Sequence, residues 1–527
     1  MSIFNNDHNN SAELARDLDR MDNLSEKLSD KLSDKLSDKL LDDLTDVSFL
    51  TYSPGEITVP PQLGKNPLTG SKVNKIVFAD DTASGRPCTL VDDFITKNIY
   101  PYYSNTHSNA TCGIRMKNYV ERTREIIRKT MNLSPRHKVF FSGNGTTGAF
   151  NHLVNKIDFT RHREIFVHNT PFEHHSNFLP WRERIKDLKQ MGALIDRKIE
   201  QRLIEVKHSD STKRSVNEGL QLNVDTYINN LSNELGKTVN KKDRLDIFSL
   251  TACSNVTGQR FDLYYSKLWE FVKQRRSEGY NIYLILDCAC SAPYTNLDLT
   301  KCDGLCFSGH KFLGGQCTPG VLIIDENLVE VSHPYEPGGG CVEKADDKCV
   351  VYKEDVESRE MGGTPNIVGI VRLGQVLMIK NAMIDIIEKN ESMMSKYVTV
   401  KMKMLELKYN NFKVINLDQR CSEDLPIYSV VIKGLHYNFV TVLFNDLFGI
   451  QTRGGISCCG TLSRICKETY NVNGWCRITF SYLHTKQTVD YILKALEYLI
   501  VNGKTYEKYY DYDSKKNLFT IRSSEKK

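Results

Sequence analysis

Three separate segments of the chain carry side chains that could together serve an enzyme using an amine nucleophile. A glycine- and threonine-rich turn at residues 142–148 is followed by Asp287 and, later, by Lys311. A lysine desolvated between a strand and a glycine loop, here beside His310, has a lowered pKa and can form an imine with a carbonyl. The turn follows an apolar run and precedes a helical pattern, so its N–H groups could bind a phosphate.

Each of these features also has an ordinary structural interpretation. The turn could only cap a helix, Asp287 could be held by loop amides, and Lys311 could be a solvated charge. Their order along the chain, however, is that of a pyridoxal-phosphate (PLP) site. In such a site Asp287 would pair with the pyridinium nitrogen of the cofactor and keep it protonated. We therefore predict that PLP binds here and that Lys311 supplies the amine.

Further motifs resemble the class V aminotransferases of PLP fold type I, in particular the cysteine desulfurase and selenocysteine lyase branch. The resemblance runs from about Ile76 to Tyr512 and rests on EHHSNFLPW at 173–181, SNVTG at 254–258, SGHK at 308–311 and GGTPN at 362–366. It implies a Schiff base on Lys311 and contact between Asp287 and the ring nitrogen of the cofactor.

The same resemblance implies the other cofactor contacts. His174 would stack on the pyridine ring, and Asn255 would contact the 3-oxygen of the cofactor. Within one subunit the phosphate ligands would be Thr146, Thr147, Ser308 and His310. Thr364 would reach the phosphate of the neighbouring subunit in a homodimer. His174 could instead belong to a surface turn, Asn255 to a loop, and Thr364 to a turn before Pro365.

A glycine-rich segment at 451–460 and the strand pattern at 474–480 bear on the reaction. In the similar desulfurases an arginine lies five residues before a mobile nucleophilic cysteine, and Arg453 and Cys458 keep that spacing. Arg477 resembles the arginine that grips the substrate α-carboxylate. The resemblance implies that L-cysteine becomes L-alanine while its sulfur passes to Cys458 as a persulfide. Lys311 and His174 would be the other catalytic residues.

Several alternatives stay open. Cys459 is an equally plausible thiol, because the chain has 15 cysteines. Cys290 stands where many desulfurases place a glutamine, which leaves the electronic environment of the ring open. Selenocysteine lyase, transamination and β-lyase chemistry are possible on the same frame, as is a non-catalytic dimeric scaffold. The spacing of Cys288, Cys290, Cys302 and Cys306 does not match a zinc site, so no metal is expected.

These residues require a framework of buried strands. Continuous apolar runs at 138–141, 164–167, 282–286 and 320–324 alternate with helical patterns. Such runs favour strands buried on both faces of a mostly parallel sheet in an α/β domain. Strand candidates at 427–432 and 477–480 indicate a smaller α+β domain. We predict a large PLP-binding domain over 73–375 and a small C-terminal domain over 376–527, which carries the cysteine loop.

The first 72 residues differ in composition from the rest. The unit Leu-Ser-Asp-Lys recurs there, with leucines at 24, 28, 32, 36, 40 and 44. A spacing of four drifts by about 40° per step around a helix, so these leucines do not hold one seam. We predict a low-complexity tail over 1–72 that is disordered or marginally helical, with a docking helix as the alternative.

The bulk composition sets the remaining expectations. The chain has 527 residues, 26% of them charged, and a net charge of +5, which does not indicate binding to nucleic acid or to a membrane surface. No apolar run approaches the ~20 residues that span a bilayer. The N-terminus lacks a signal peptide, and many cysteines without a secretory signal favour a reducing compartment. We expect a cytoplasmic homodimer that acts on a small amino acid, with a possible sulfur-acceptor protein as partner.

Overall fold

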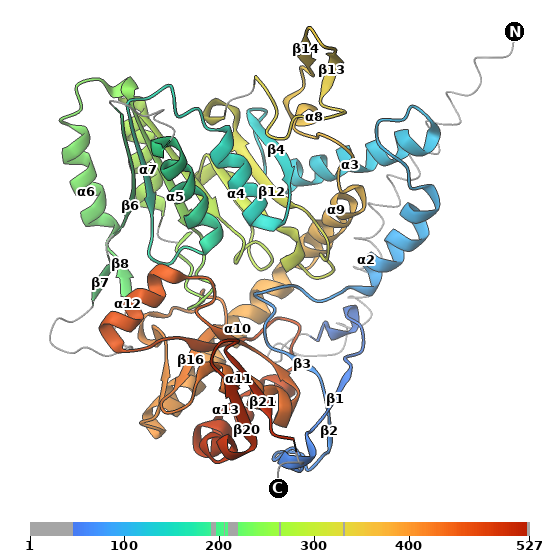
Figure 1. Ribbon diagram of the computed structural model, residues 1–527, viewed down its shortest axis with the longest axis vertical. Helices are drawn as coiled ribbons and strands as arrows, with labels where there is room; N and C mark the ends of the chain where they lie inside the picture. Colours follow the sequence, from blue (N-terminus) through green and yellow to red (C-terminus); the bar gives the residue numbers. More distant parts are fainter. Residues whose placement is uncertain are drawn as a thin grey trace, which may run out of the picture.

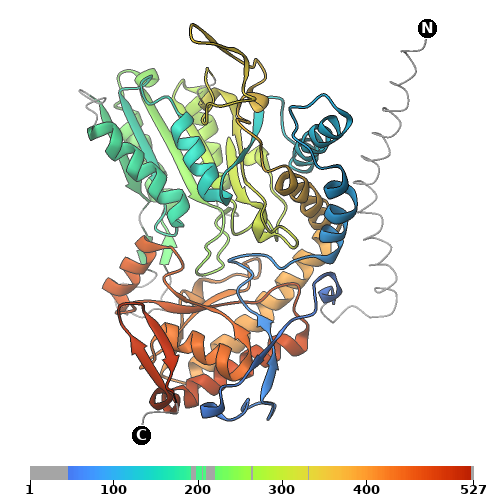
Figure 2. The ribbon, with the colours of Figure 1, turned by 45° about the vertical axis from the view of Figure 1, so that its right-hand side comes forward.

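The computed structural model describes residues 46–190, 197–204, 206–208, 220–262, 265–329 and 332–523. The Leu-Ser-Asp-Lys repeat lies outside the described residues. Figure 1 shows the larger domain, drawn in green and yellow, above a smaller domain drawn in orange and red. The same division is visible in the turned view of Figure 2.

The larger domain is built on a seven-stranded sheet with the order β4-β12-β11-β10-β9-β5-β6. Its strands are β4 (His137–Ser142), β5 (Glu164–Asn169), β6 (Lys198–Leu203), β9 (Arg244–Thr251), β10 (Asn281–Asp287), β11 (Gly304–Ser308) and β12 (Gly320–Asp325). All neighbouring strands are parallel except β12, which runs antiparallel to both β11 and β4. The predicted α/β class with a mostly parallel sheet is confirmed. The direction of β12 was not predictable, because a continuous apolar run records burial on two faces and not strand polarity.

Consecutive strand residues point into two different hydrophobic clusters. Val139 and Leu284 belong to one cluster, and their neighbours Phe140 and Ile285 belong to the other. The first cluster is completed by α3 (Thr111–Thr130), α7 (Ser266–Ser277) and α9 (Ile367–Ala382), and the second by α4 (Gly145–Lys156) and α5 (His175–Gln190). Burial on both faces explains why the strands read as unbroken apolar runs.

The smaller domain contains a four-stranded antiparallel sheet with the order β15-β16-β19-β18. Its elements are β15 (Phe412–Val414), β16 (Ile427–Ile432), β18 (Arg453–Gly455), β19 (Trp475–Thr479), α10 (Ile384–Lys408), α11 (Tyr437–Phe448), α12 (Gly460–Tyr470) and α13 (Lys486–Asn502). Within the described residues no single helix is long and apolar enough to cross a membrane, although α9 and α10, bent by 69°, pass that test of length and composition together.

Residues 56–72 also pack on this smaller domain, where Asn66 Nδ2 donates to the Tyr491 hydroxyl of α13 at 2.8 Å. The strand β1 (Glu56–Thr58) pairs with β2 (Val73–Lys75), and β3 (Val77–Phe78) pairs with β17 (Ile450–Gln451). Figure 1 shows these blue strands beside the orange and red elements. The structure therefore differs from the predicted tail boundary at residue 72, because regular structure starts earlier. Strands of only two or three residues are too short to leave a periodic sequence signal.

Shorter elements complete the molecule. They are α2 (Thr89–Phe94), α6 (Val224–Leu235), α8 (Val356–Arg359), β7 (Val206–His208), β8 (Leu220–Leu222), β13 (Val342–Ala345), β14 (Val350–Tyr352), β20 (Tyr510–Asp513) and β21 (Leu518–Ile521). The last four form two antiparallel hairpins.

Candidate active site

A cavity of about 480 Å³ lies where the carboxyl ends of the central strands face the smaller domain. The carboxyl ends of parallel strands meet at one edge of a sheet, which is where α/β proteins bind ligands. Every predicted site residue except Thr364 lines this cavity: Thr146, Thr147, His174, Asn255, Asp287, Ser308, His310 and Lys311 from the larger domain, and Arg453, Cys458 and Arg477 from the smaller one.

One end of the cavity has the form of a phosphate cradle. The backbone N–H of Thr146, in the first turn of α4, donates to Ser308 Oγ at 2.8 Å, and the Thr146 and Ser308 hydroxyls are 2.7 Å apart. Gly145 has φ of +59°, and a Cβ there would approach Ser308 Oγ to 2.8 Å. Burial, together with the charge of Lys311, lowers the pKa of His310. Hydroxyl and N–H donors at a helix N-terminus fit the phosphate group of PLP.

Thr147 is joined to a residue that sequence analysis left without a role. Its hydroxyl lies 2.6 Å from Ser176 Oγ. Ser176 is the second residue of α5, so this contact links the starts of α4 and α5 across the cradle. A serine in a helical first turn is too common a feature to have identified this role from sequence alone.

Asp287 closes β10 and is buried in the cavity wall. Its Oδ1 accepts the Ala289 N–H at 2.9 Å. Burial raises the pKa of Asp287, while the Ala289 N–H and the charge of Lys311 act in the opposite direction. A buried carboxylate needs a cationic partner, and a protonated ring nitrogen would supply one. This side chain therefore fits the pyridine end of PLP.

Lys311 ends the short turn of residues 309–311 that follows β11. Burial is the main cause that lowers the pKa of its amine, while Cys290 and Asp287 oppose this shift. In the described part of the chain, no hydrogen bond or ion pair engages the amine. A partly desolvated amine without a fixed partner is more easily deprotonated and can act as a nucleophile or base.

His174 presents a neutral ring to the cavity. The Ser176 N–H donates to His174 Nδ1 at 3.1 Å, so the ring proton is on Nε2. Burial, and then the charge of Lys311, lowers the pKa of His174 to about 3. A neutral aromatic ring at this position suits the predicted stacking on a pyridine ring.

The segment that carries His174 is anchored by Glu173 and Asn177, for which the sequence predicted no role. The buried Glu173 accepts the Thr251 N–H at 3.0 Å and the Asn177 Nδ2–H at 2.6 Å. Thr251 is the last residue of β9, so these bonds fix the start of α5 to the edge of the sheet. The only sequence signal was an acidic and an amide residue four positions apart at a helix start.

The smaller domain contributes two arginines to the cavity. Arg453 and Arg477 are directly opposite each other on the antiparallel strands β18 and β19. Arg477 is 1% exposed, and it donates from Nη1 to the Asn255 backbone oxygen at 3.1 Å. Its Nη2 lies 2.5 Å from Asp80 Oδ1, a contact that sequence analysis missed. Two guanidinium groups so placed form a site for a carboxylate.

The loop between β18 and α12 holds a strained turn. Ser457 and Cys458 have φ of +52° and +55°, in the left-handed region that non-glycine residues seldom adopt. Asn255 Nδ2 donates to the Ser457 oxygen at 2.7 Å, and Trp475 Nε1 donates to Ser457 Oγ at 3.1 Å. These bonds fix the loop against the cavity, although Asn255 was expected to contact the cofactor.

The adjacent thiols of Cys458 and Cys459 lie in different environments. Cys458 lines the cavity, with its Sγ 3.5 Å from Arg453 Nη2. Cys459 is fully buried, and its thiol donates to the Pro171 oxygen at 3.7 Å. Burial raises the pKa of the Cys459 thiol. A thiol that is protonated and enclosed is a poor nucleophile, which favours Cys458.

Thr364 is not brought into the cavity of its own chain. It is exposed, and its hydroxyl accepts a hydrogen bond from Asn105 Nδ2 at 2.8 Å. Its predicted contact with a neighbouring subunit therefore stays a prediction. No group of three or more histidine, cysteine or acidic side chains in the described ranges could hold a metal ion.

The fold and the cavity define a two-domain α/β enzyme whose strand ends present a lysine amine, a buried aspartate and a phosphate cradle. The chain belongs to the aminotransferase class-V family, whose model matches residues 77–492.

Curated relatives match over most of their length. A probable cysteine desulfurase from Borreliella burgdorferi is 25% identical over 441 residues, which are 81% of this chain and 92% of that protein. A cysteine desulfurase from Wigglesworthia glossinidia brevipalpis is 27% identical over 448 residues, which are 82% and 94% of the two chains.

Solved structures share the fold. The apo cysteine desulfurase from Thermococcus onnurineus has a TM-score of 0.63 at 21% identity and covers 84% of this chain and 98% of that chain. The S-sulfonic acid form of the cysteine desulfurase CsdA from Escherichia coli has a TM-score of 0.59 at 22% identity, with 80% and 93% covered. These likenesses confirm the predicted fold class.

Proposed function

We propose that this protein is a PLP-dependent cysteine desulfurase that converts L-cysteine to L-alanine and takes the sulfur onto Cys458. The observation that carries the proposal is that one cavity holds the Lys311 amine, the Cys458 thiol and two arginines, Arg453 and Arg477. Relatives named cysteine desulfurase, at 25% and 27% identity over most of both chains, support it.

The residues that would hold the cofactor come from the larger domain. Ser308, His310 and the start of α4 would bind its phosphate, and Asp287 would pair with its ring nitrogen. His174 would pack on the ring face. When bound, PLP withdraws electrons from the substrate Cα and so makes its proton acidic.

The chain itself would position the substrate and move its proton. Arg477 would bind the α-carboxylate of L-cysteine, in competition with Asp80, its partner at 2.5 Å. Lys311, whose pKa is lowered chiefly by burial, would take the Cα proton as a neutral amine.

Cys458 would then accept the sulfur. Arg453 Nη2, 3.5 Å from Cys458 Sγ, would orient this sulfur for its attack on the substrate sulfur. The substrate carbon–sulfur bond breaks, a sulfur–sulfur bond forms on Cys458, and the carbon takes up a proton. One L-cysteine and one thiol thus give one L-alanine and one persulfide, with no external oxidant.

Partners and location follow as expectations. Cys458 is partly exposed, so a reductant or an acceptor protein could collect its persulfide sulfur. We propose that the enzyme works as a homodimer in the cytoplasm. All 15 cysteines are free thiols in the structure, which fits a reducing compartment.

The decisive experiment incubates the holoenzyme with L-cysteine and a reductant and measures alanine and sulfide together. Equal yields of the two products are expected. Pyruvate and ammonia in place of alanine would instead identify a β-lyase, and the absence of cofactor absorbance from the purified chain would favour a scaffold.

A matched pair of variants tests the assignment of the thiol. Cys458→Ala should lower alanine formation by about a hundredfold or more, because no nucleophile then removes the sulfur. Cys459→Ala removes the adjacent, enclosed thiol and should keep the rate within about threefold. The reverse pattern would move the role to Cys459.

A further inference from the structure

We propose that Cys253 and Cys290, in the wall of the active-site cavity, are a pair of thiols that is oxidised to a disulfide. Both residues line the cavity, and both are buried, with 1% and 5% of their surface exposed. Neither has a part in the desulfurase chemistry described above, so the proposal stands without it.

The topology of the sheet brings the two thiols together. Cys253 follows β9 and Cys290 follows β10, which are adjacent parallel strands with Thr251 opposite Asp287. The Ala252 N–H donates to the Asp287 oxygen at 2.9 Å, so the strands leave the sheet side by side. Adjacent strands lie about 5 Å apart, so Cys253 and Cys290, two and three residues beyond these strand ends, start from neighbouring positions.

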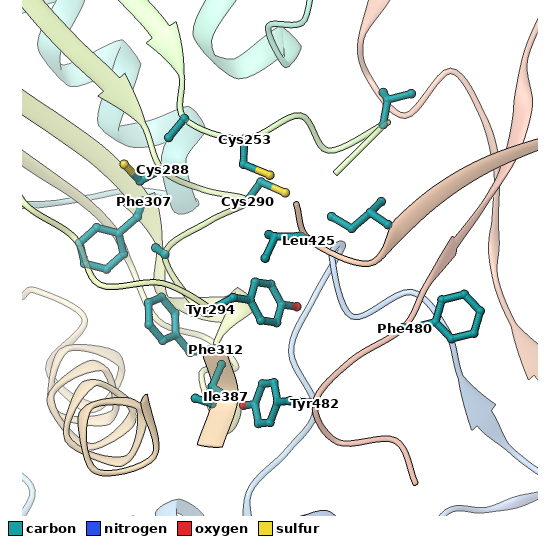
Figure 3. Packing of buried hydrophobic residues seen from close by; sticks show 14 of the residues in the cluster. Cys253, Cys288, Cys290, Tyr294, Phe307, Phe312, Ile387, Leu425, Phe480 and Tyr482 are labelled. Atoms are coloured by element: carbon teal, nitrogen blue, oxygen red, sulfur yellow. The ribbon is translucent and has the colours of Figure 1, made fainter. Parts of the chain in front are cut away.

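The sulfur atoms point toward one another. Figure 3 shows the two side chains with their sulfurs adjacent, whereas the sulfur of Cys288 lies apart, beside Phe307. Apart from burial, each of the two thiols has the largest influence on the pKa of the other, while the Cys253 thiol donates to the Gly258 oxygen at 3.4 Å. Two cysteines whose sulfurs lie adjacent in this way can form a disulfide with little movement of the backbone.

The two thiols have different reactivities. The neighbouring Cys253 thiol, and then the charges of Lys311 and Arg477, lower the pKa of Cys290 against the effect of burial. Burial raises the pKa of Cys253, and also that of Cys288. Cys290 is therefore the attacking thiolate of the pair, and Cys253 is the resolving thiol.

The oxidant is a hydroperoxide, of which hydrogen peroxide is the smallest. The Cys290 thiolate attacks one peroxide oxygen, breaks the O–O bond and becomes a sulfenic acid, and the other oxygen leaves as water after protonation. The Cys253 sulfur then attacks the sulfenic sulfur and expels a second water. Two thiols lose two electrons and two protons, and the peroxide becomes two waters.

Oxidation would act on the amine in the same cavity. After burial, Cys290 is the largest influence on the pKa of Lys311, and its negative form raises that pKa. A disulfide removes this charge from beside Lys311. Disulfide formation is therefore expected to alter the pH-dependent absorbance of the bound cofactor.

The test uses the full-length holoenzyme with Cys458→Ala, so that oxidation at Cys458 does not contribute. The protein is treated with hydrogen peroxide, the remaining thiols are alkylated, and the digest is analysed by mass spectrometry. A peptide pair linked through Cys253 and Cys290, two hydrogens lighter than the reduced pair and released by dithiothreitol, is expected. The cofactor absorbance titration should shift with the link and return on reduction.

Two single variants and one control sharpen the test. Cys253→Ser and Cys290→Ser should each abolish the link, while Cys288→Ser, at a buried site on the same loop, should retain it. Recovery of Cys253 and Cys290 as separate alkylated peptides, at a peroxide dose that oxidises exposed Cys349, would overturn the proposal. So would a link from Cys290 to any other cysteine. Because the reporter chain lacks Cys458, failure here leaves the desulfurase proposal untouched.

Discussion

Arg477 is already paired before any substrate binds. Its guanidinium is buried, and Asp80, which is partly exposed, balances its charge at 2.5 Å. A substrate α-carboxylate offers the same guanidinium two oxygens in a planar arrangement. Asp80 and the substrate carboxylate therefore compete for the Arg477 guanidinium. Because the Asp80–Arg477 contact is lost when substrate binds, the free energy of substrate binding is less favourable.

We expect Asp80→Asn to tighten substrate binding. The amide keeps the shape of the side chain but removes the competing charge, so the KM for L-cysteine should fall about fivefold, the equivalent of ~1 kcal/mol. Steady-state kinetics with L-cysteine and a reductant measure this. Asp81→Asn is the matched control, because Asp81 pairs with Arg86 at 2.8 Å and not with Arg477. A raised KM in Asp80→Asn would mean that Asp80 orients Arg477.

At the scale of elements, the loop between β18 and α12 is held where the first residues of two helices contact each other. His175 begins α5, and Gly460 begins α12. The Gly460 N–H donates to His175 Nε2 at 3.1 Å, and the His175 N–H donates to the Cys458 oxygen at 2.8 Å. The helix that starts after His174 thus holds the loop of the smaller domain, and we expect His175 to act as a positioning residue.

Removing the His175 ring should loosen this loop without emptying the cofactor site. His175→Ala is expected to lower alanine formation about tenfold, because a misplaced nucleophile loses its orientation. The absorbance of the bound cofactor should stay as in the parent protein.

Amide hydrogen exchange over residues 456–462 should quicken in the same variant. His175→Gln, whose amide oxygen can accept the Gly460 N–H, should recover much of the rate. An unchanged exchange pattern together with a lost rate would contradict a positioning role.

At the scale of the whole molecule, His484 ties distant parts of the chain together. It accepts the Ser481 N–H on Nδ1 at 3.2 Å, so Nε2 carries the proton and donates to the Phe78 oxygen at 2.7 Å. Arg86 Nη2 also lies 2.8 Å from this nitrogen. Burial, and then the charge of Arg86, lowers the pKa of His484 to about 4.

This shift predicts acid sensitivity with a definite sign. Between pH 6.5 and about 4 the unfolded histidine binds a proton that the folded one does not. The contribution of neutral His484 to the free energy of unfolding is therefore complete above pH 6.5. It is lost as the pH falls, by up to about 1.4 kcal/mol per pH unit. Thermal denaturation of His484→Gln should show a flatter fall in Tm over this range than the parent. Parallel curves would show that His484 is charged in the fold.

Assembly is the other property of the whole molecule, and Thr364 is the residue that tests it. Thr364 lies on an exposed loop where the His107 ring contacts the Gly363 oxygen at 2.9 Å. If it binds phosphate in the neighbouring subunit, Thr364→Ala alone should weaken PLP binding about tenfold, through loss of a hydrogen bond to a charged group.

Mixing subunits distinguishes this role from a local one. A hybrid of Thr364→Ala with Lys311→Ala subunits contains one site with both Lys311 and an intact Thr364 of the partner subunit. Cofactor titration of co-refolded hybrids should then recover one tight site per dimer. No recovery, or a monomer on size-exclusion chromatography, would rule out the shared site.

Part of the structure could be predicted because it depends on residues that are close together in the sequence. Burial on both faces left unbroken apolar runs, so β10 and β12 were identified within a residue or two of their observed bounds. Asp287 was identifiable because it closes a buried strand, and Lys311 because it lies between such a strand and a glycine loop, where an unpaired charged side chain is costly.

The rest was decided by contacts between residues far apart in sequence. Asp80 meets Arg477 across 397 positions, and Cys459 is enclosed with its thiol against the Pro171 oxygen, 288 positions away. The strand β3 exists through pairing with β17, more than 370 positions away. Such contacts depend on how the two domains pack, which no local pattern records. The sequence by itself determined the chemistry that the cavity carries, and the tertiary structure decided which thiol faces it and which charges compete there.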